Sequence, residues 1–380
     1  MTDAIGKLLQ QTQLAGVAAT VLVDGEVVFE GAGGVRVAGE PAPMTSDSVF
    51  AIFSMTKAIT GAAAMQLVER GKLDLDKPAS TYIGAIGDIK VLDGFDADGH
   101  AKLRAPKNPV TLRNLLSHTS GCAYELWNAD VIKAQADLGL PSIFALEKAG
   151  LSTPLMFDPG TTWEYGTGID WAGLLVEAVT EQTLGAYCSE QFFQPLGMTS
   201  TGFAPTDDML SRLASLHVRT PDGIVPMALP APAAPEFEMG GGGLLSTVGD
   251  YAKFAQMILD KGRSGNNQLL SEATVAEMSR NQLGDIPIRV LPSTTPLTLD
   301  LDIPGDEKGW GLTFLLNLTG TPQGRSAGSL SWAGVANSYY WIDPTKRVVG
   351  VWATQLFPFY DPTVLAELNA FESAVYEFVG

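Results

Sequence analysis

One stretch constrains the fold more than any other, because it predicts a helix without a polar face. Apart from Lys57 and Gln66, every residue from Phe53 to Val68 is apolar or small. A helix that is apolar all round belongs in the centre of a domain and not on its surface. Gly71 is a suitable residue to end it. The sequence therefore predicts a globular domain built around a buried helix.

Ser54 and Lys57 lie three residues apart and share a face at the start of this helix. A serine hydroxyl attacks an acyl carbonyl when a base takes its proton, and a lysine among apolar side chains can have its pKa lowered enough to help. Free N–H groups at the helix N-terminus would stabilise the resulting oxyanion. The structural alternative is an N-cap serine and a solvated lysine, because Ser-x-x-Lys alone is a weak signal.

Five segments in a fixed order resemble the motifs of serine hydrolases built on the scaffold of class C β-lactamases and penicillin-binding proteins. The resemblance runs from residue 54 to residue 335 and so covers most of the chain. Within this superfamily the chain is most similar to the family VIII carboxylesterases. The five segments are Ser54–Lys57 with the following Ala-Ile-Thr-Gly-Ala-Ala, Leu115–Gly121, Pro159–Tyr165, Gly241–Thr247 and Trp332–Val335.

The resemblance implies roles for individual residues. Tyr165 stands where the family has its catalytic tyrosine, and we expect it to act as a coupled base with Lys57, whose ammonium would lower the pKa of the phenol. The backbone N–H groups of Ser54 and Val335 would form the oxyanion hole. The residues expected to contact substrate are Trp332, Gly334, Tyr124 and Trp127, the last two from the aromatic content of the helical region.

Two departures from the β-lactamase pattern favour an esterase. The chain has Tyr165-Gly166-Thr167 where β-lactamases have Tyr-x-Asn, and so lacks an amide that helps to hold a lactam. It has Trp332–Val335 where they have Lys-Thr-Gly, and so lacks the lysine and threonine that grip a lactam's carboxylate.

We therefore expect a serine carboxylesterase that hydrolyses short-chain esters through an acyl-enzyme on Ser54, with no cofactor and no metal. The alternatives on the same scaffold are a β-lactamase, a D-amino-acid peptidase and an acyltransferase. A non-enzymatic alternative is an inactive binding homologue, against which the intact Ser54, Lys57 and Tyr165 set argues.

The resemblance also implies an α+β fold like that of class C β-lactamases, with an antiparallel sheet flanked by helices. Residues 1–73 and 245–380 are expected to form the lobe that holds the sheet. Residues 74–244, rich in short helices and in loops with Pro, Gly and Asp, are expected to form an inserted, mainly helical lobe. The active site would lie between the two lobes.

Local patterns predict the individual elements. Hairpins are expected over 17–29 and 338–353, and one strand over Trp310–Leu316. Helices are expected to start at Thr111, Asp170, Thr247 and Pro362. The five prolines between Pro221 and Pro235 predict irregular chain.

Three other residues were weighed as nucleophiles or bases. Ser326 lies in Gly-x-Ser-x-Gly, but no strand precedes this segment and no helix follows it, as an α/β-hydrolase elbow requires, so a turn is expected. We expect His118 to hold a loop and Cys122 to be a small buried side chain. His100, His118 and His217 have no metal-ligand spacing.

Charge and composition exclude some partners. The net charge of −18 argues against binding to nucleic acid or to an anionic membrane. There is no apolar run of about 18 residues and no evident secretory leader. Cys122 and Cys188 do not make a disulfide framework. We therefore expect a cytoplasmic enzyme with a small ester as its partner, and its oligomeric state stays open.

Overall fold

The sheet takes its strands from both ends of the chain. The computed structural model describes residues 2–228, 235–303 and 307–380. Within them, one antiparallel sheet has the strand order β11-β12-β13-β14-β15-β1-β2, in which Ala18 of β1 lies opposite Ala353 of β15. Its strands are β11 (Lys308–Trp310), β12 (Leu315–Asn317), β13 (Leu330–Gly334), β14 (Ser338–Asp343), β15 (Val348–Ala353), β1 (Gly16–Val23) and β2 (Glu26–Gly34). Both predicted hairpins are confirmed.

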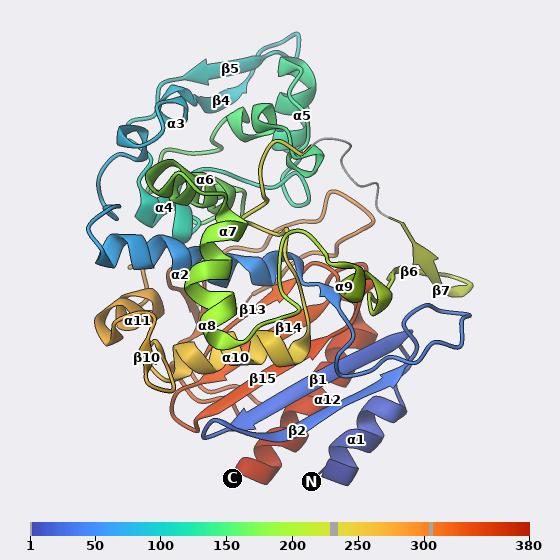
Figure 1. The fold of residues 1–380 in the computed structure, drawn as a ribbon. Coiled ribbons are helices and arrows are strands. Elements are labelled where there is room, and N and C mark those ends of the chain that lie inside the picture. Colours follow the sequence, from blue (N-terminus) through green and yellow to red (C-terminus); the bar gives the residue numbers. More distant parts are fainter. Residues whose placement is uncertain (1, 229–234, 304–306) are drawn as a thin grey trace.

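Helices cover both faces of this sheet. On one face lie α1 (Thr2–Gln10) and α12 (Pro362–Val379), and on the other lies α10 (Val248–Leu259) (Figure 1). Because both faces are covered, the central strands β1 and β15 carry almost only apolar side chains, and nearly all their residues are buried. The predicted α+β architecture is confirmed.

The predicted central helix is α2 (Thr56–Glu69), and every residue from Thr56 to Leu67 is buried. It ends just before Gly71, whose φ of +68° is in the left-handed region that glycine adopts readily. Figure 1 shows α2 between the sheet and the helices of the middle segment. A helix covered from both sides needs apolar residues all round, which explains its sequence.

The middle segment supplies most of the remaining helices. Thr111 caps α4 with a capping box that includes Asn114, and Thr247 caps α10, so both predicted starts are confirmed. The lobe boundaries at residues 74 and 244 stay a prediction. The remaining helices are α3 (Ala85–Asp88), α4 (Leu112–Leu116), α5 (Ala129–Leu138), α6 (Gly168–Thr180), α7 (Leu184–Cys188), α8 (Gln194–Leu196), α9 (Asp207–Ser211) and α11 (Glu272–Ser279).

Short strands form small sheets beside the main one. One of these contradicts the prediction of irregular chain over 221–235, because Gly223–Met227 is a strand, while Pro230 and Pro232 lie outside the described residues. Pro226 is accommodated because this strand is at a sheet edge. The pairs are β3 (Phe50–Ala51) with β8 (Leu245–Ser246), β4 (Val91–Phe95) with β5 (Ala101–Arg104), β9 (Arg263–Ser264) with β10 (Asn267–Gln268), and β6 (Leu216–Thr220) with both β7 (Gly223–Met227) and β16 (Leu356–Phe357).

The prediction of one strand over Trp310–Leu316 is wrong. This segment is the end of β11, a turn, and the start of β12. The chain reverses at Thr313, whose φ is +79°, and the N–H of Leu312 donates to the carbonyl of Met278 in another element. A contact distant in sequence therefore interrupts an apparently continuous strand.

No helix in the described ranges has both the length and the apolar character needed to cross a membrane.

Candidate active site

Ser54 lies in a single turn of 3-10 helix, Phe53–Met55, that continues directly into α2. Phe53 has a φ of +43°, a backbone conformation that bulky residues rarely adopt and that occurs most often at functional sites. Ser54 is left partly exposed at this turn. The predicted start of the helix at Ser54 was therefore two residues too early, because its first turn is tighter than an α-helix.

The side chain of Lys57 is fully buried, and its amine nitrogen is bonded to three oxygens. Its Nζ lies 3.1 Å from Ser54 Oγ, 3.0 Å from Tyr124 Oη and 2.6 Å from the carbonyl oxygen of Gly241. A lysine head group has three donors, so all of them are used here. The structure thus brings Ser54 and Lys57 together, and the alternative of a solvated lysine is wrong.

Burial lowers the pKa of Lys57 to about 7, although the carboxylate of Asp170 acts in the opposite direction. Near neutral pH, a fraction of the molecules therefore has Lys57 in its neutral amine form. A neutral amine within hydrogen-bond distance of Ser54 Oγ can take the hydroxyl proton as the oxygen attacks.

Tyr165 lies against the same amine. Lys57 Nζ is 4.8 Å from the centroid of the Tyr165 ring, and the indole Nε1 of Trp332 donates a hydrogen bond of 3.0 Å to Tyr165 Oη. Burial raises the pKa of Tyr165, while the hydroxyls and N–H nearby lower it less. The net shift of the Tyr165 pKa is therefore upward, whereas a lowered pKa was expected. Tyr165 thus keeps its proton near neutral pH, and Lys57 is the better candidate for a base.

Tyr124, predicted only as part of the substrate pocket, is bonded directly to Lys57. Its side chain is buried, and its ring centroid is 5.4 Å from that of Tyr165. Burial raises the pKa of Tyr124, so its hydroxyl is also neutral. The contact with Lys57 was missed because the two residues are far apart in sequence and no spacing rule connects them.

Asp170 is the functional candidate that the sequence did not reveal. The sequence predicts it as a helix start, but α6 begins at Gly168 and Asp170 is fully buried in its first turn. Asp170 Oδ1 accepts a hydrogen bond of 2.8 Å from the N–H of Gly241, whose carbonyl accepts from Lys57. Burial raises the pKa of Asp170 to about 6, against the effect of Lys57. Two buried ionisable groups are therefore hydrogen-bonded to the backbone of the same residue, Gly241.

The end of β13 packs against the turn that carries Ser54. A Cβ atom added to Gly334 would lie 2.4 Å from the carbonyl oxygen of Ile52, so only glycine allows this approach. Val335, the next residue, is partly exposed, as Ser54 is. The structure thus holds the Trp332–Val335 segment next to the nucleophile turn, as the motif order suggested.

An aromatic cluster surrounds Tyr165. Trp127 lies 5.8 Å from it between ring centroids, and its Nε1 donates to the carbonyl of Leu299 at 3.3 Å. Trp310 packs against both Tyr165 and Trp332. These aromatic side chains are buried and pack against one another.

None of His118, Ser326 and Cys122 is hydrogen-bonded to Lys57 among the described residues. His118 is buried beside Tyr165, and its Nδ1 accepts from the N–H of Gly166 at 3.2 Å, as expected of a loop-holding residue. Burial lowers the pKa of His118 well below its usual value.

Ser326 lies in irregular chain between turns, and its backbone N–H donates to Asp343 Oδ2 at 2.8 Å. Cys122 is buried, and burial raises its pKa to about 11. Among the described residues, no three His, Cys, Asp or Glu side chains could jointly hold a metal ion.

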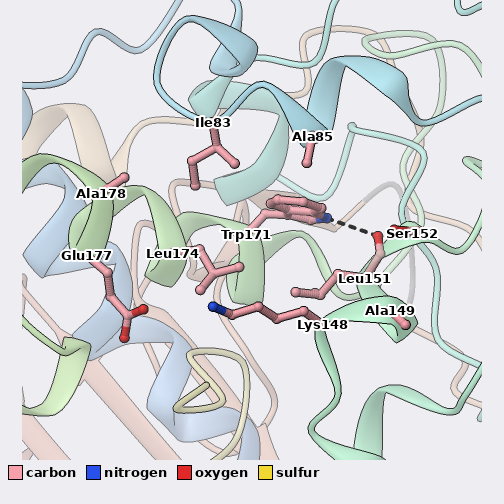
Figure 2. Close-up of a pocket in the computed structure, with 10 residues that line it drawn as sticks. All are labelled: Ile83, Ala85, Lys148, Ala149, Leu151, Ser152, Trp171, Leu174, Glu177 and Ala178. Atoms are coloured by element: carbon pink, nitrogen blue, oxygen red, sulfur yellow. Dashed lines mark hydrogen bonds between the residues drawn. The ribbon is translucent and has the colours of Figure 1, made fainter. Parts of the chain in front are cut away.

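A hollow of about 590 Å³ is lined in part by residues of α6 (Figure 2). Trp171 and Leu174 form its inner wall, and Lys148 and Glu177 also line it. Ser54 is not among the lining residues. A smaller hollow of about 170 Å³ adjoins Trp332 and Ala333.

Comparisons with known proteins show the family of this chain. A family model described as Beta-lactamase matches residues 1–374. The chain is 31% identical over 362 residues to a lovastatin esterase of Penicillium rubens, which covers 91% of this chain and 89% of the esterase. It is also 31% identical over 348 residues to a monacolin J acid methylbutanoyltransferase of Aspergillus terreus, covering 88% of this chain and 83% of the transferase.

Among solved structures, the fold is similar to a mutant of the simvastatin synthase LovD from Aspergillus terreus. The TM-score is 0.85 at 27% identity, covering 99% of this chain and 96% of the synthase. The hydrolase EstCE1, described as having promiscuous acyltransferase activity, has the same fold, with a TM-score of 0.77 at 23% identity, covering 99% of this chain and 97% of EstCE1.

Proposed function

Because this chain belongs to the beta-lactamase family, in which its relatives act on esters or acyl groups, we propose that it hydrolyses carboxylic esters of short acyl groups through an acyl-enzyme on Ser54. The observation that carries this proposal is the hydrogen bond between the buried amine of Lys57 and Ser54 Oγ. Burying an amine costs free energy of folding, and a binding protein without activity would gain nothing that offsets this cost.

The first half of the reaction acylates Ser54. Lys57 Nζ takes the hydroxyl proton while Ser54 Oγ forms a bond to the ester carbonyl carbon, and the carbonyl oxygen becomes an oxyanion. The N–H groups of Ser54 and Val335 would donate to this oxyanion. When the intermediate collapses, the bond from carbon to the alcohol oxygen breaks. The departing alkoxide takes a proton from the Lys57 ammonium while the neutral hydroxyl of Tyr165 donates a hydrogen bond to it.

The second half releases the acyl group. Lys57, again neutral, takes a proton from water, the hydroxide oxygen attacks the acyl carbonyl, and Ser54 Oγ leaves and takes the proton from the Lys57 ammonium. An alcohol in place of water would give a new ester, so hydrolysis and acyl transfer use the same groups. This is why an acyltransferase is the second candidate function, and relatives of both kinds are equally similar to this chain.

The residues around the nucleophile support an ester over a lactam. The indole N–H of Trp332 donates a hydrogen bond to Tyr165 Oη. In a β-lactamase, the corresponding segment would present a lysine to the antibiotic's carboxylate. Thr167 stands where β-lactamases have the asparagine of Tyr-x-Asn, so no side-chain amide is offered there to a lactam. Trp332, Gly334, Tyr124 and Trp127 remain candidates for contact with the ester. A relative's name includes a methylbutanoyl group, and a short acyl group of this kind suits our proposal.

The test compares p-nitrophenyl acetate and butyrate with a chromogenic cephalosporin. We expect kcat/KM for the esters to exceed that for the cephalosporin by orders of magnitude. Equal or faster turnover of the lactam would overturn the assignment. A primary alcohol added to the butyrate assay separates the two candidates, because a transferase forms a butyrate ester and a strict hydrolase forms butyrate alone.

A further inference from the structure

Asp170 is a fully buried carboxylate with one oxygen that lacks a hydrogen-bond partner within the described parts of the chain. Oδ1 accepts from the N–H of Gly241, whereas Oδ2 has no such bond. Leaving a buried carboxylate oxygen unsatisfied is costly, so some compensating interaction is required. The amine of Lys57 interacts with the Asp170 carboxylate through space and favours its charged form.

Gly241 connects the two groups through its own peptide atoms. Its carbonyl accepts from Lys57 Nζ at 2.6 Å and its N–H donates to Asp170 at 2.8 Å. A Cβ atom on residue 241 would lie 2.8 Å from Asp170 Oδ2 and 2.9 Å from Tyr124 Oη. Glycine is therefore needed here, because any side chain would displace both the carboxylate and the tyrosine that touches Lys57.

The next residue, Trp171, anchors this turn from the other side. Figure 2 shows its indole lying in the hollow of about 590 Å³, and its Nε1 donates to the carbonyl of Leu151 at 3.2 Å. The first turn of α6 is thus held both at the active site and at the surface. Asp170 has little freedom to move away from Lys57.

We propose that Asp170 is a positioning residue, which fixes the Lys57 amine through Gly241 and controls how readily that amine gives up its proton. The inference deepens the proposed function, since it rests on Lys57 serving as the base for Ser54. The negative carboxylate favours the ammonium form, whereas burial favours the neutral amine. Asp170 therefore keeps Lys57 able to alternate between the two forms near neutral pH.

Other ionisable groups also face this pair, and each is fixed in its neutral form. Burial raises the pKa of Tyr124, Tyr165 and Cys122, so that all three keep their protons near neutral pH. Burial and the charge of Lys57 lower the pKa of His118, which stays uncharged. Asp170 is thus the group whose charge can be removed to change Lys57 selectively.

The experiment measures the charge of Lys57 directly. Protein labelled with ¹³C at the lysine ε-carbon is titrated by NMR, and the Lys57 signal is assigned by its loss in Lys57→Arg. In Asp170→Asn we expect the Lys57 midpoint to fall by about one pH unit, because an opposite charge has been removed. Asparagine keeps the acceptor for the N–H of Gly241. Asp170→Ser removes the charge with a smaller side chain and should give the same shift if asparagine does not fold.

Asp250→Asn is the matched control. Asp250 also lies buried in the first turn of its helix, α10, and accepts a hydrogen bond from the N–H of Ser200 at 2.7 Å. The Asp250→Asn variant should lose stability as Asp170→Asn does, but should leave the titration midpoint of Lys57 unchanged. An unchanged midpoint in both Asp170 variants, or an equal shift in the control, would overturn the proposal.

The rate of Ser54 labelling by a p-nitrophenyl phosphonate is followed in parallel. Its midpoint should move with that of Lys57 in the Asp170 variants. If Ser54 of the unmodified protein is not labelled, the hydrolase proposal fails, while the NMR midpoint still decides whether Asp170 controls Lys57.

Discussion

The indole N–H of Trp332 donates a hydrogen bond of 3.0 Å to the hydroxyl of Tyr165, and both side chains are buried. This bond connects the last part of β13 to the tyrosine beside Lys57. It uses one lone pair of the phenol oxygen, so it fixes the direction in which the Tyr165 hydroxyl can donate. In this chain, therefore, β13 orients a group of the active site as well as lining it.

Changing Trp332 to Phe should lower kcat for a short ester by roughly fivefold, because one hydrogen bond worth about 1 kcal/mol is lost while an aromatic side chain remains. Trp310→Phe is the control, since Trp310 packs against Trp332 but its own indole N–H has no partner among the described residues. Steady-state kinetics on folded variants decides. Equal losses in kcat would show that only the packing matters.

Changing Ser54 to Ala should abolish ester turnover and labelling by a serine-directed phosphonate, because no other group can form the acyl-enzyme. Ser326→Ala should leave both nearly intact, since the contact of Ser326 with Asp343 uses its backbone N–H. Mass spectrometry of the labelled protein locates the modified serine. A label on residue 326 would show that the wrong nucleophile had been chosen.

Activity should rise with pH to a midpoint near 7, the value to which burial lowers the pKa of Lys57. Below this pH the ammonium holds a proton and cannot accept that of Ser54, so kcat/KM should fall about tenfold per pH unit. Above it the amine is neutral and the rate should level off. The measurement is kcat/KM for p-nitrophenyl butyrate against pH. A profile that rises only near the pKa of an ordinary lysine would contradict the neutral-amine mechanism.

Changing Val335 to Pro should lower kcat by about 100- to 1000-fold, because proline removes a proposed oxyanion donor. Val335→Ala keeps the N–H and should be tolerated. The comparison requires that circular dichroism show both variants to be folded. Near-normal kcat in a folded proline variant would remove Val335 from the oxyanion hole.

Signals confined to a few neighbouring residues predicted the structure well. The caps at Thr111 and Thr247 depend on a side chain and an N–H three residues away, so the sequence contains both partners. The strand over Trp310–Leu316 was mispredicted because its reversal depends on a hydrogen bond to Met278, which no local pattern contains.

The same distinction applies to the active site. Ser54 and Lys57 are near in sequence, and the motif order pointed to Tyr165. The roles of Tyr124 and Asp170 were missed because Lys57 meets both only after the middle segment has folded over α2. Buried polar contacts between distant segments leave no periodic pattern in the sequence.

The pairing of β1 with β15 also determines when this enzyme can first become active. During synthesis β1 is made long before β15, residues 348–353, which is its neighbour on one side. Until then an apolar strand has an open edge, which invites association with other chains. We therefore expect the nascent protein to depend on protection by chaperones, and the sheet to close only once β15 has been made.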